Sequence, residues 1–255
     1  MEAPLIVIPP IINALITGLF AGVVLRQYLT RHRVYQLYWS IALCMAFIAT
    51  LAYLFMIVLR PTSATGILLF RLYYVLGGVL MPAWLGMGSI ALINKPWLVR
   101  LSQTLLFFLS LVGIAFTLDA HIDMQKLSQI AGTPGTGTLQ TGPWLIPTIV
   151  LNTLGVVAIG GVAIYSGWQM LMQQKHLGGL RTRNVLWANV LILGGALLDA
   201  AAGTLARTLG LESAFWLIMA VGWIVLFAGV VLASQRPRTG SVPTKAPNHA
   251  HHANV

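Results

Sequence analysis

Long apolar runs alternate with short polar loops along the whole chain. Seven such runs cover residues 5–25, 38–59, 68–93, 97–118, 144–172, 185–205 and 215–232. A helix of about 20 apolar residues crosses the hydrocarbon core of a bilayer, where only helices and closed barrels satisfy their own backbone hydrogen bonds. The pattern therefore predicts an all-α, polytopic membrane helix bundle with seven transmembrane helices.

The segments outside these runs are short, with two exceptions. Residues 119–142 form the longest loop, and its Gly- and Thr-rich part, residues 132–138, predicts a mobile segment with little apolar content on which to fold. The end of the chain is polar and contains proline, which favours disorder. We therefore expect one seven-helix transmembrane domain, residues 1–233, followed by a disordered cytoplasmic tail, residues 234–255.

The composition indicates that the solvent of these helices is lipid. Of the 255 residues, 58% are hydrophobic and 8% are charged, whereas soluble domains carry about 25% charged residues. The formal charge of +10 would suggest nucleic acid in a soluble protein, but here the basic residues lie in short loops between apolar runs. The expected partner is therefore the lipid bilayer and not nucleic acid, and a further cytoplasmic or membrane protein partner stays open.

The positions of the basic residues predict the orientation, because loops rich in Lys and Arg tend to stay in the cytoplasm. One set of alternate loops, together with the tail, holds eleven of the fifteen: Arg26, Arg31, Arg33, Lys95, Arg100, Lys175, Arg181, Arg183, Arg236, Arg238 and Lys245. The other set holds Arg60, Arg71, Lys126 and Arg207. We therefore expect a multi-pass protein of the cell membrane with its N-terminus outside and its C-terminus inside.

The residues inside the spans do not support several kinds of membrane chemistry. All histidines lie in loops or in the tail, so transmembrane haem ligation is not expected. The last span has no lysine for a retinal Schiff base, and no span holds a glutamate for an intramembrane metalloprotease. The single cysteine, Cys44, permits no internal disulfide. The sequence predicts no cofactor, no metal site and no catalytic residue, and it does not point to an enzyme.

Asp199 is the only acidic residue inside a predicted span. A charge at bilayer depth is costly, so such a residue usually faces the bundle interior or a cavity. Gly195 and Gly203 lie one turn before and after it, and small residues on one helix face let a neighbouring helix approach. Two interpretations stay open: Asp199 packs helices, or it binds a ligand, a cation or a proton.

Four more polar residues lie near the predicted outer surface. From a rise of about 1.5 Å per residue, Asn13 and Asn152 lie about 12 Å inside their spans, Tyr53 about 10 Å, and Tyr74 closer to the surface. Interhelical hydrogen bonds of about 0.6 kcal/mol each would explain them. The alternative is an outward-facing polar pocket, whose candidate residues are Asp199, Asn152, Asn13, Tyr74, Tyr53 and Arg71. The sequence does not decide whether these side chains face one another.

Arg71 opens the third span. A long basic side chain at such a position usually extends to the lipid headgroups and anchors its helix at the interface. The alternative is an ion pair with Asp199, which requires tilted helices because the two residues differ in depth.

Residues 70–93 carry a weak family resemblance. With RLYY at residues 71–74 and PAWLG at residues 82–86, and with YWS at residues 38–40 after a basic loop, the chain resembles seven-span bacterial membrane proteins of uncharacterised function. It is also distantly similar to the seven-span sensor regions that precede bacterial histidine kinases. The resemblance implies a sensory bundle and carries no catalytic residue. The chain ends after its seventh span, so no kinase output is expected.

Three functions fit the sequence. The first is a receptor-like or sensory seven-helix bundle that binds a small ligand from outside and signals through a partner. The second is a small transporter or channel, which would need a polar path through the inner half as well. The third is a structural subunit of a larger membrane complex. The inner half of the spans offers few polar residues, which favours the first function.

Overall fold

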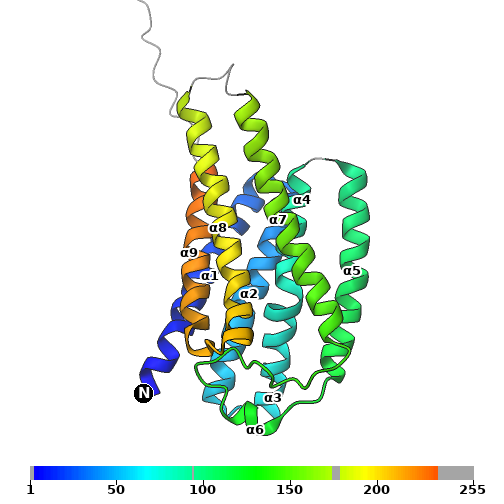
Figure 1. Ribbon diagram of the computed structural model, residues 1–255, viewed down its shortest axis with the longest axis vertical. Coiled ribbons are helices and arrows are strands. Elements are labelled where there is room, and N and C mark those ends of the chain that lie inside the picture. The colour runs from blue at the N-terminus through cyan, green and yellow to red at the C-terminus, as the bar shows by residue number, and fades with distance from the viewer. Residues whose placement is uncertain (1–2, 94, 174–178, 235–255) are drawn as a thin grey trace, which may run out of the picture.

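The computed structural model describes residues 3–93, 95–173 and 179–234 of the 255-residue chain. These residues form a bundle of helices that run along its long axis (Figure 1). Seven helices of this part are long and apolar enough to cross a membrane, which confirms the predicted all-α class and the seven spans. Apart from Ser234, the last residue of α9, the predicted tail lies outside the described residues.

Apart from α7, the spans are longer than the apolar runs that predicted them, because a helix continues past the hydrocarbon into the polar boundary. In chain order the elements are α1 (Ala3–Arg31), α2 (Val34–Val58), α3 (Ala64–Tyr73), η1 (Tyr74–Leu80), α4 (Met81–Leu92), α5 (Pro96–Asp119), α6 (Met124–Ser128), α7 (Leu145–Gln173), α8 (Gly179–Leu209), η2 (Glu212–Ala214) and α9 (Phe215–Ser234). The third span consists of α3, η1 and α4, which follow one another without a break.

The two ends of the bundle differ. The first residues of α1, the α2–α3 turn, α6 and the α8–α9 turn gather at one end, which we call the α6 end; it is at the bottom of Figure 1. At this end an aromatic cluster contains Tyr53, Phe70, Trp144 and Trp216. The second apolar cluster fills the middle and the opposite half of the bundle, where the helices pack through largely aliphatic side chains.

The π-helical segment η1 is explained by the proline that follows it. A proline in a helix has no N–H to donate to the carbonyl four residues earlier, and its ring clashes with that carbonyl. For Pro82 this carbonyl belongs to Gly78, which lies inside η1. The wider turn of a π-helix relieves such a clash, and these segments recur at functional sites.

Helices α8 and α9 pack antiparallel with their backbones close together. A Cβ atom at Gly195 of α8 would lie 2.6 Å from the Leu226 nitrogen and 2.7 Å from the Gly222 oxygen of α9. A Cβ atom at Gly229 of α9 would lie 2.9 Å from both the Ala188 oxygen and the Ile192 nitrogen of α8. The expected packing role of Gly195 is therefore correct. Gly203 differs, because its Cβ position has no other atom within 4 Å.

Helix α7 crosses α8 at an angle. Near the opposite end the two helices touch, since Asn189 Nδ2 donates to Ser166 Oγ at 3.1 Å and the Leu193 side chain lies 3.4 Å from the Cβ position of Gly160. Toward the α6 end, α7 leans away from α8 and approaches α5 (Figure 1). The divergence of α7 and α8 leaves room between them in the half of the bundle nearer α6.

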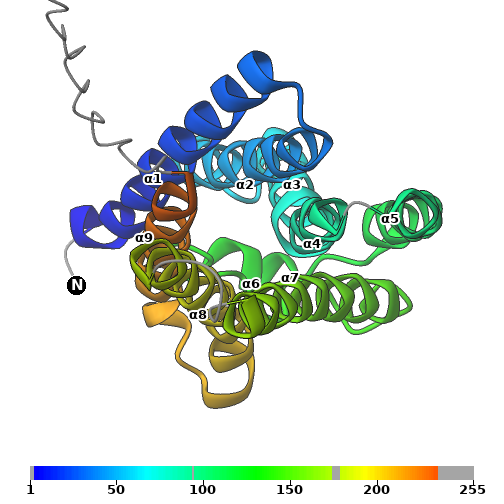
Figure 2. The same ribbon diagram turned by 90° about the horizontal axis from the view of Figure 1, so that it is seen from above.

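Residues 120–144, which we call the α6 loop, have a fold of their own, and this corrects the prediction of a segment with little to fold on. An isolated bridge joins Ile122 and Leu139. Leu127, Ile130 and Leu139 are buried against the aromatic cluster of the α6 end. The Gly-rich part, read as a sign of mobility, supplies tight turns instead, with φ of +82° at Gly132. Seen from the opposite end, α6 lies in the middle of the surrounding helices (Figure 2).

Candidate functional site

A cavity of about 590 Å³ lies between the helices in the half of the bundle nearer the α6 end. Its walls come from six of the seven spans, all except α5, and from the α6 loop. Four of the six residues singled out in the sequence line it: Asn13, Tyr74, Asn152 and Asp199. Its volume falls within the range of about 300–1,000 Å³ that is typical of small-ligand pockets.

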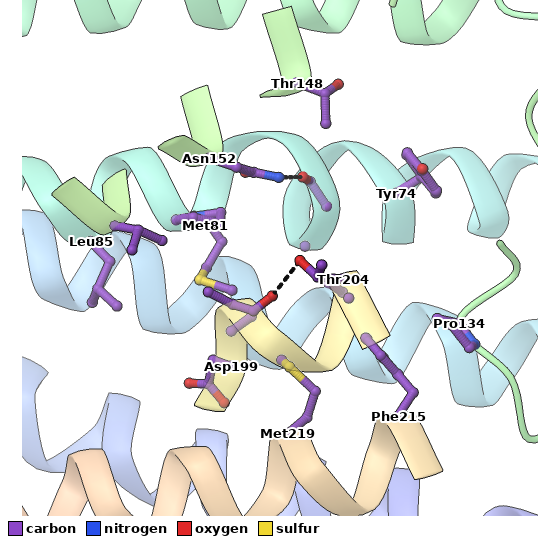
Figure 3. A pocket seen from close by; sticks show the side chains of 18 of the residues that line it. Tyr74, Met81, Leu85, Pro134, Thr148, Asn152, Asp199, Thr204, Phe215 and Met219 are labelled. Carbon is purple, nitrogen blue, oxygen red and sulfur yellow. Dashed lines mark hydrogen bonds between the residues drawn. The ribbon is translucent and has the colours of Figure 1, made fainter. Parts of the chain in front are cut away.

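Asn152 of α7 donates from Nδ2 to the Gly78 carbonyl of η1 at 3.0 Å (Figure 3). In an α-helix the nitrogen of residue 82 would donate to this carbonyl, but Pro82 has no N–H. Asn152 supplies the donor in its place. Because a carbonyl only accepts, the bond also fixes the orientation of the amide. The Asn152 Oδ1 atom is buried and has no hydrogen-bond partner among the described residues.

Asn13 of α1 is held in the same way. Its Nδ2 donates to Thr50 Oγ1 of α2 at 3.0 Å, and that hydroxyl donates to the Ala46 carbonyl at 2.9 Å. Because Thr50 uses its single hydroxyl proton in the bond to Ala46, it can only accept from Asn13, and this fixes the orientation of the Asn13 amide. The Asn13 Oδ1 atom is buried without a partner in the part of the chain that the structure describes.

Asp199 lies on α8, on a different wall of the cavity from Asn152 (Figure 3). Its side chain is half-buried, and its Oδ1 atom packs against Gly222 of α9, where an added Cβ atom would collide with the carboxylate. Oδ1 is a third buried oxygen without a hydrogen-bond partner among the described residues. Asp199 thus faces the bundle interior, as expected, and is the one charged residue among those that line the cavity.

Aromatic rings surround the part of the cavity nearest α6. Tyr73, Tyr74, Trp144, Phe215 and Trp216 line it there, and Trp223 lines it farther along α9. The rings of Tyr74 and Trp144 meet edge to face with centroids 5.4 Å apart, and those of Tyr73 and Trp216 lie 6.1 Å apart. The Trp223 indole nitrogen is buried and has no hydrogen-bond partner among the described residues. Apart from Tyr74, the aromatic lining was not predicted, because its rings come from three separate segments and share no sequence pattern.

Tyr53 lies behind the cavity wall and holds the α6 loop. Its hydroxyl donates to the Ile130 carbonyl at 3.0 Å and accepts from the Gly132 nitrogen at 2.9 Å. Tyr73 adds a bond of 3.2 Å to the Pro134 carbonyl. The two tyrosines therefore fix the loop over the cavity, which the loop residues Pro134 and Thr136 help to line.

Arg71 also lies away from the cavity. Its guanidinium donates to the Thr117 and Ala120 carbonyls, both at 3.4 Å, at the C-terminal end of α5. A positive charge is favourable there because the last carbonyls of a helix carry a partial negative charge. The alternative of an ion pair with Asp199 is not what the structure shows, and Arg71 joins the third and fourth spans instead.

Replacing Tyr53 with phenylalanine should loosen the α6 loop. The variant keeps the ring and removes both hydrogen bonds, so hydrogen exchange at the Gly132 amide should become about tenfold faster, as expected for a loss of about 1–1.5 kcal/mol. The measurement is hydrogen–deuterium exchange of the protein in lipid nanodiscs. Tyr35→Phe, at the opposite end, is the control and should change nothing in the loop. Unchanged exchange at Gly132 in Tyr53→Phe would show that the hydroxyl does not hold the loop.

The fold and the cavity define a polytopic seven-helix membrane protein with a ligand-sized internal site. No protein-family model matches the chain, and comparison with curated proteins and with solved structures finds no significant match. The function is therefore argued from the geometry of the cavity.

Proposed function

We propose that this chain is a receptor-like or sensory protein of the cell membrane that binds a small ligand in the cavity near the α6 end. The observation that carries the proposal is the convergence of Asn13, Asn152 and Asp199 from three helices on one cavity. Each leaves a buried oxygen without a hydrogen-bond partner in the described part of the chain. Such oxygens are costly in an apolar interior, and a ligand that donates hydrogen bonds would offset that cost.

The packing beyond the cavity supports a receptor more than a transporter. Phe20, Leu43 and Leu226 are buried between the cavity and the opposite end. The Phe20 ring meets the rings of Trp223 at 6.3 Å and Phe227 at 4.9 Å, measured between centroids. A receptor needs a closed base of this kind, so that the ligand is held and its binding is transmitted by movement of the helices.

The proposal places the α6 end outside the cell. By the sequence, eleven of the fifteen basic residues fall in the predicted inner loops and tail, and basic loops tend to remain in the cytoplasm. A reporter that is active only in the cytoplasm, fused to the C-terminus, should therefore be active, and the same reporter at the N-terminus should be inactive. The reverse pattern would show that the orientation is opposite to the one proposed and that the cavity lies nearer the cytoplasm.

Ligand binding is tested with a variant that fills the cavity. Ala200 lines the cavity, so Ala200→Trp should block it, while Leu197→Trp on the same helix replaces a side chain that is 50% exposed and outside the cavity. Thermal unfolding in nanodiscs is measured with a panel of small cationic, anionic and neutral compounds. At least one should stabilise the wild type and Leu197→Trp, by about 2.7 kcal/mol at a hundredfold excess over its Kd, and not Ala200→Trp.

Two outcomes would contradict the proposed receptor function. If no compound stabilises the wild type, or if stabilisation is equal in Ala200→Trp, the cavity is not a ligand site. If the stabilising compound is instead carried across proteoliposome membranes at a rate that depends on the wild-type protein, the chain is a transporter.

A further inference from the structure

We propose that the cavity takes an amphipathic organic cation, and that this ligand reaches it from the bilayer through the opening between α7 and α8. The proposal rests on the ligand-binding function above and adds the class of ligand and its route. Three observations carry it: where the cavity is closed, where it is open, and which chemical groups line it.

The cavity is closed at both of its ends along the bundle axis. At the α6 end it is covered by the α6 loop, which Tyr53 and Tyr73 fix through their hydroxyls. Toward the opposite end it meets the apolar packing around Phe20 and Trp223. A ligand therefore does not reach the cavity along the bundle axis without displacing one of these.

The side between α7 and α8 is open. Thr153 and Val157 of α7 line the cavity and are exposed, Val157 by 63%. Across from them, Gly203 and Thr204 of α8 line it and are also exposed. The two helices touch nearer the opposite end, through Asn189 and its partner on α7, and diverge toward the α6 end (Figure 1).

This side opening faces lipid and not water. Thr153 lies about 12 Å along α7 from Leu145, the first residue of its span, at a rise of about 1.5 Å per residue. On the same measure Thr204, on the α8 side of the opening, lies about 3 Å from Ala206, the last residue of its span. Both positions fall within the candidate spans, Thr204 close to the boundary, so a molecule that enters between them comes from the bilayer.

Among the described residues that line the cavity, the buried polar atoms without a partner are three oxygens, of Asn13, Asn152 and Asp199, and the indole nitrogens of Trp216 and Trp223. The three oxygens accept hydrogen bonds, and they are the groups that decide the ligand class here. The oxygens of Asn13 and Asn152 are left over after both amide nitrogens have donated. Two threonine hydroxyls of the lining also use their protons within the protein: Thr148 and Thr204 donate to the carbonyls four residues earlier, at 2.8 and 3.2 Å, and can then only accept. Acceptors of this kind are complementary to a ligand that carries N–H or O–H donors.

The charge of the lining residues indicates that the hydrogen-bond donor of the ligand is a cation. Asp199 is the single acidic or basic residue that lines the cavity, and the ionised form of its carboxyl group in a membrane interior needs a cation to offset its cost. The aromatic rings around it add favourable contacts, because ring faces attract ammonium groups. The ligand class is therefore an ammonium headgroup on an apolar body, with the headgroup near Asp199 and the body in the opening.

The experiment compares two probes with the same alkyl chain, dodecylammonium and dodecyl sulfate, on the protein in phosphatidylcholine nanodiscs. The chain carries a formal charge of +10, so general electrostatic attraction favours the sulfate. Dodecylammonium should nevertheless bind and raise the unfolding midpoint, and dodecyl sulfate should not. Asp199→Asn should weaken dodecylammonium binding at least about tenfold, because it removes a charge-assisted contact and keeps the shape.

Two further variants test the route. Thr204→Trp places a large ring in the opening and should slow dodecylammonium association at least about tenfold, whereas Leu197→Trp, on the lipid-facing side of the same helix, should leave it unchanged. The circular dichroism of each variant shows whether it is folded. Equal binding of the two probes, or full dodecylammonium affinity in Asp199→Asn, would overturn the inference that the ligand is a cation. Unchanged association in Thr204→Trp would overturn the route.

The failure of this inference is distinguishable from failure of the proposed function. If an anionic or neutral compound stabilises the wild type and not Ala200→Trp, the cavity is a ligand site for another chemistry, and only the cation is wrong. If no compound of either kind distinguishes the wild type from Ala200→Trp, the ligand site itself is refuted and both proposals fall.

Discussion

Replacing Gly195 with alanine should destabilise the bundle by about 1–3 kcal/mol, the usual range for overpacking a well-packed interior. The new methyl carbon would lie 2.6 Å from both the backbone nitrogen and the Cβ atom of Leu226. Neither atom can turn aside as the end of a flexible side chain would, so α8 and α9 must separate. The intrinsic gain of about 1 kcal/mol from removing a helical glycine is smaller than this cost.

Gly194 is a matched control, because it precedes Gly195 on the same helix and no atom of another described helix lies within 4 Å of its Cβ position. Gly194→Ala should therefore be neutral or stabilising by up to about 1 kcal/mol. The measurement is the unfolding midpoint of both variants in the same detergent. Equal midpoints for the two variants would mean that α8 and α9 do not pack through Gly195.

Replacing Asn152 with leucine should cost about 1–3 kcal/mol, the usual penalty for a buried carbonyl left unpaired. A hydrogen bond between membrane helices contributes only about 0.6 kcal/mol on average. The larger figure applies here because Pro82 has no N–H to donate to the Gly78 carbonyl. The Asn152 amide is the donor that replaces it. The same substitution removes one of the three unpaired oxygens around the cavity.

Thr153 provides the comparison for Asn152. It is the next residue on α7 and is exposed, so Thr153→Val should change the unfolding midpoint by no more than about 0.5 kcal/mol. If Asn152→Leu is as stable as Thr153→Val, then the π-helical segment does not depend on Asn152. A second consequence is local: hydrogen exchange in η1 should rise in Asn152→Leu and not in Thr153→Val.

The seven spans could be predicted because one property decides them. Each helix that crosses hydrocarbon must be apolar over its whole length, and this is visible in the sequence without any knowledge of its neighbours. The α6 loop could not be predicted in this way. Leu127, Ile130 and Leu139 are too widely spaced to form a pattern, and they are buried only because distant helices supply Tyr53 and Trp216.

The candidate site was found in part, for a similar reason. Asn13, Asn152 and Asp199 are conspicuous because polar side chains are rare in membrane spans, and all three line the cavity. Tyr53 shares their approximate depth and Arg71 lies nearer the end of its span, but the two side chains face the α6 loop and α5. Depth follows from residue number, whereas the direction of a side chain depends on how each helix is rotated, and a single sequence does not give that rotation.

Pro82 gave a signal that sequence reasoning missed. A proline in the middle of a span frees the carbonyl four residues earlier, and that carbonyl needs a donor from another helix. Asn152 is such a donor, since its amide has N–H groups to give. The pairing of Gly78 with an asparagine on another span could have been proposed from these two facts, although the span that supplies the asparagine could not.

The most direct measurement of the central claim is native mass spectrometry of the protein released from nanodiscs that contain dodecylammonium. The wild type and Leu197→Trp should each retain one dodecylammonium molecule, because the cavity has one carboxylate to pair with an ammonium group. Ala200→Trp, with the cavity filled, should retain none. Identical binding in the wild type and Ala200→Trp would contradict the claim that this cavity is the ligand site.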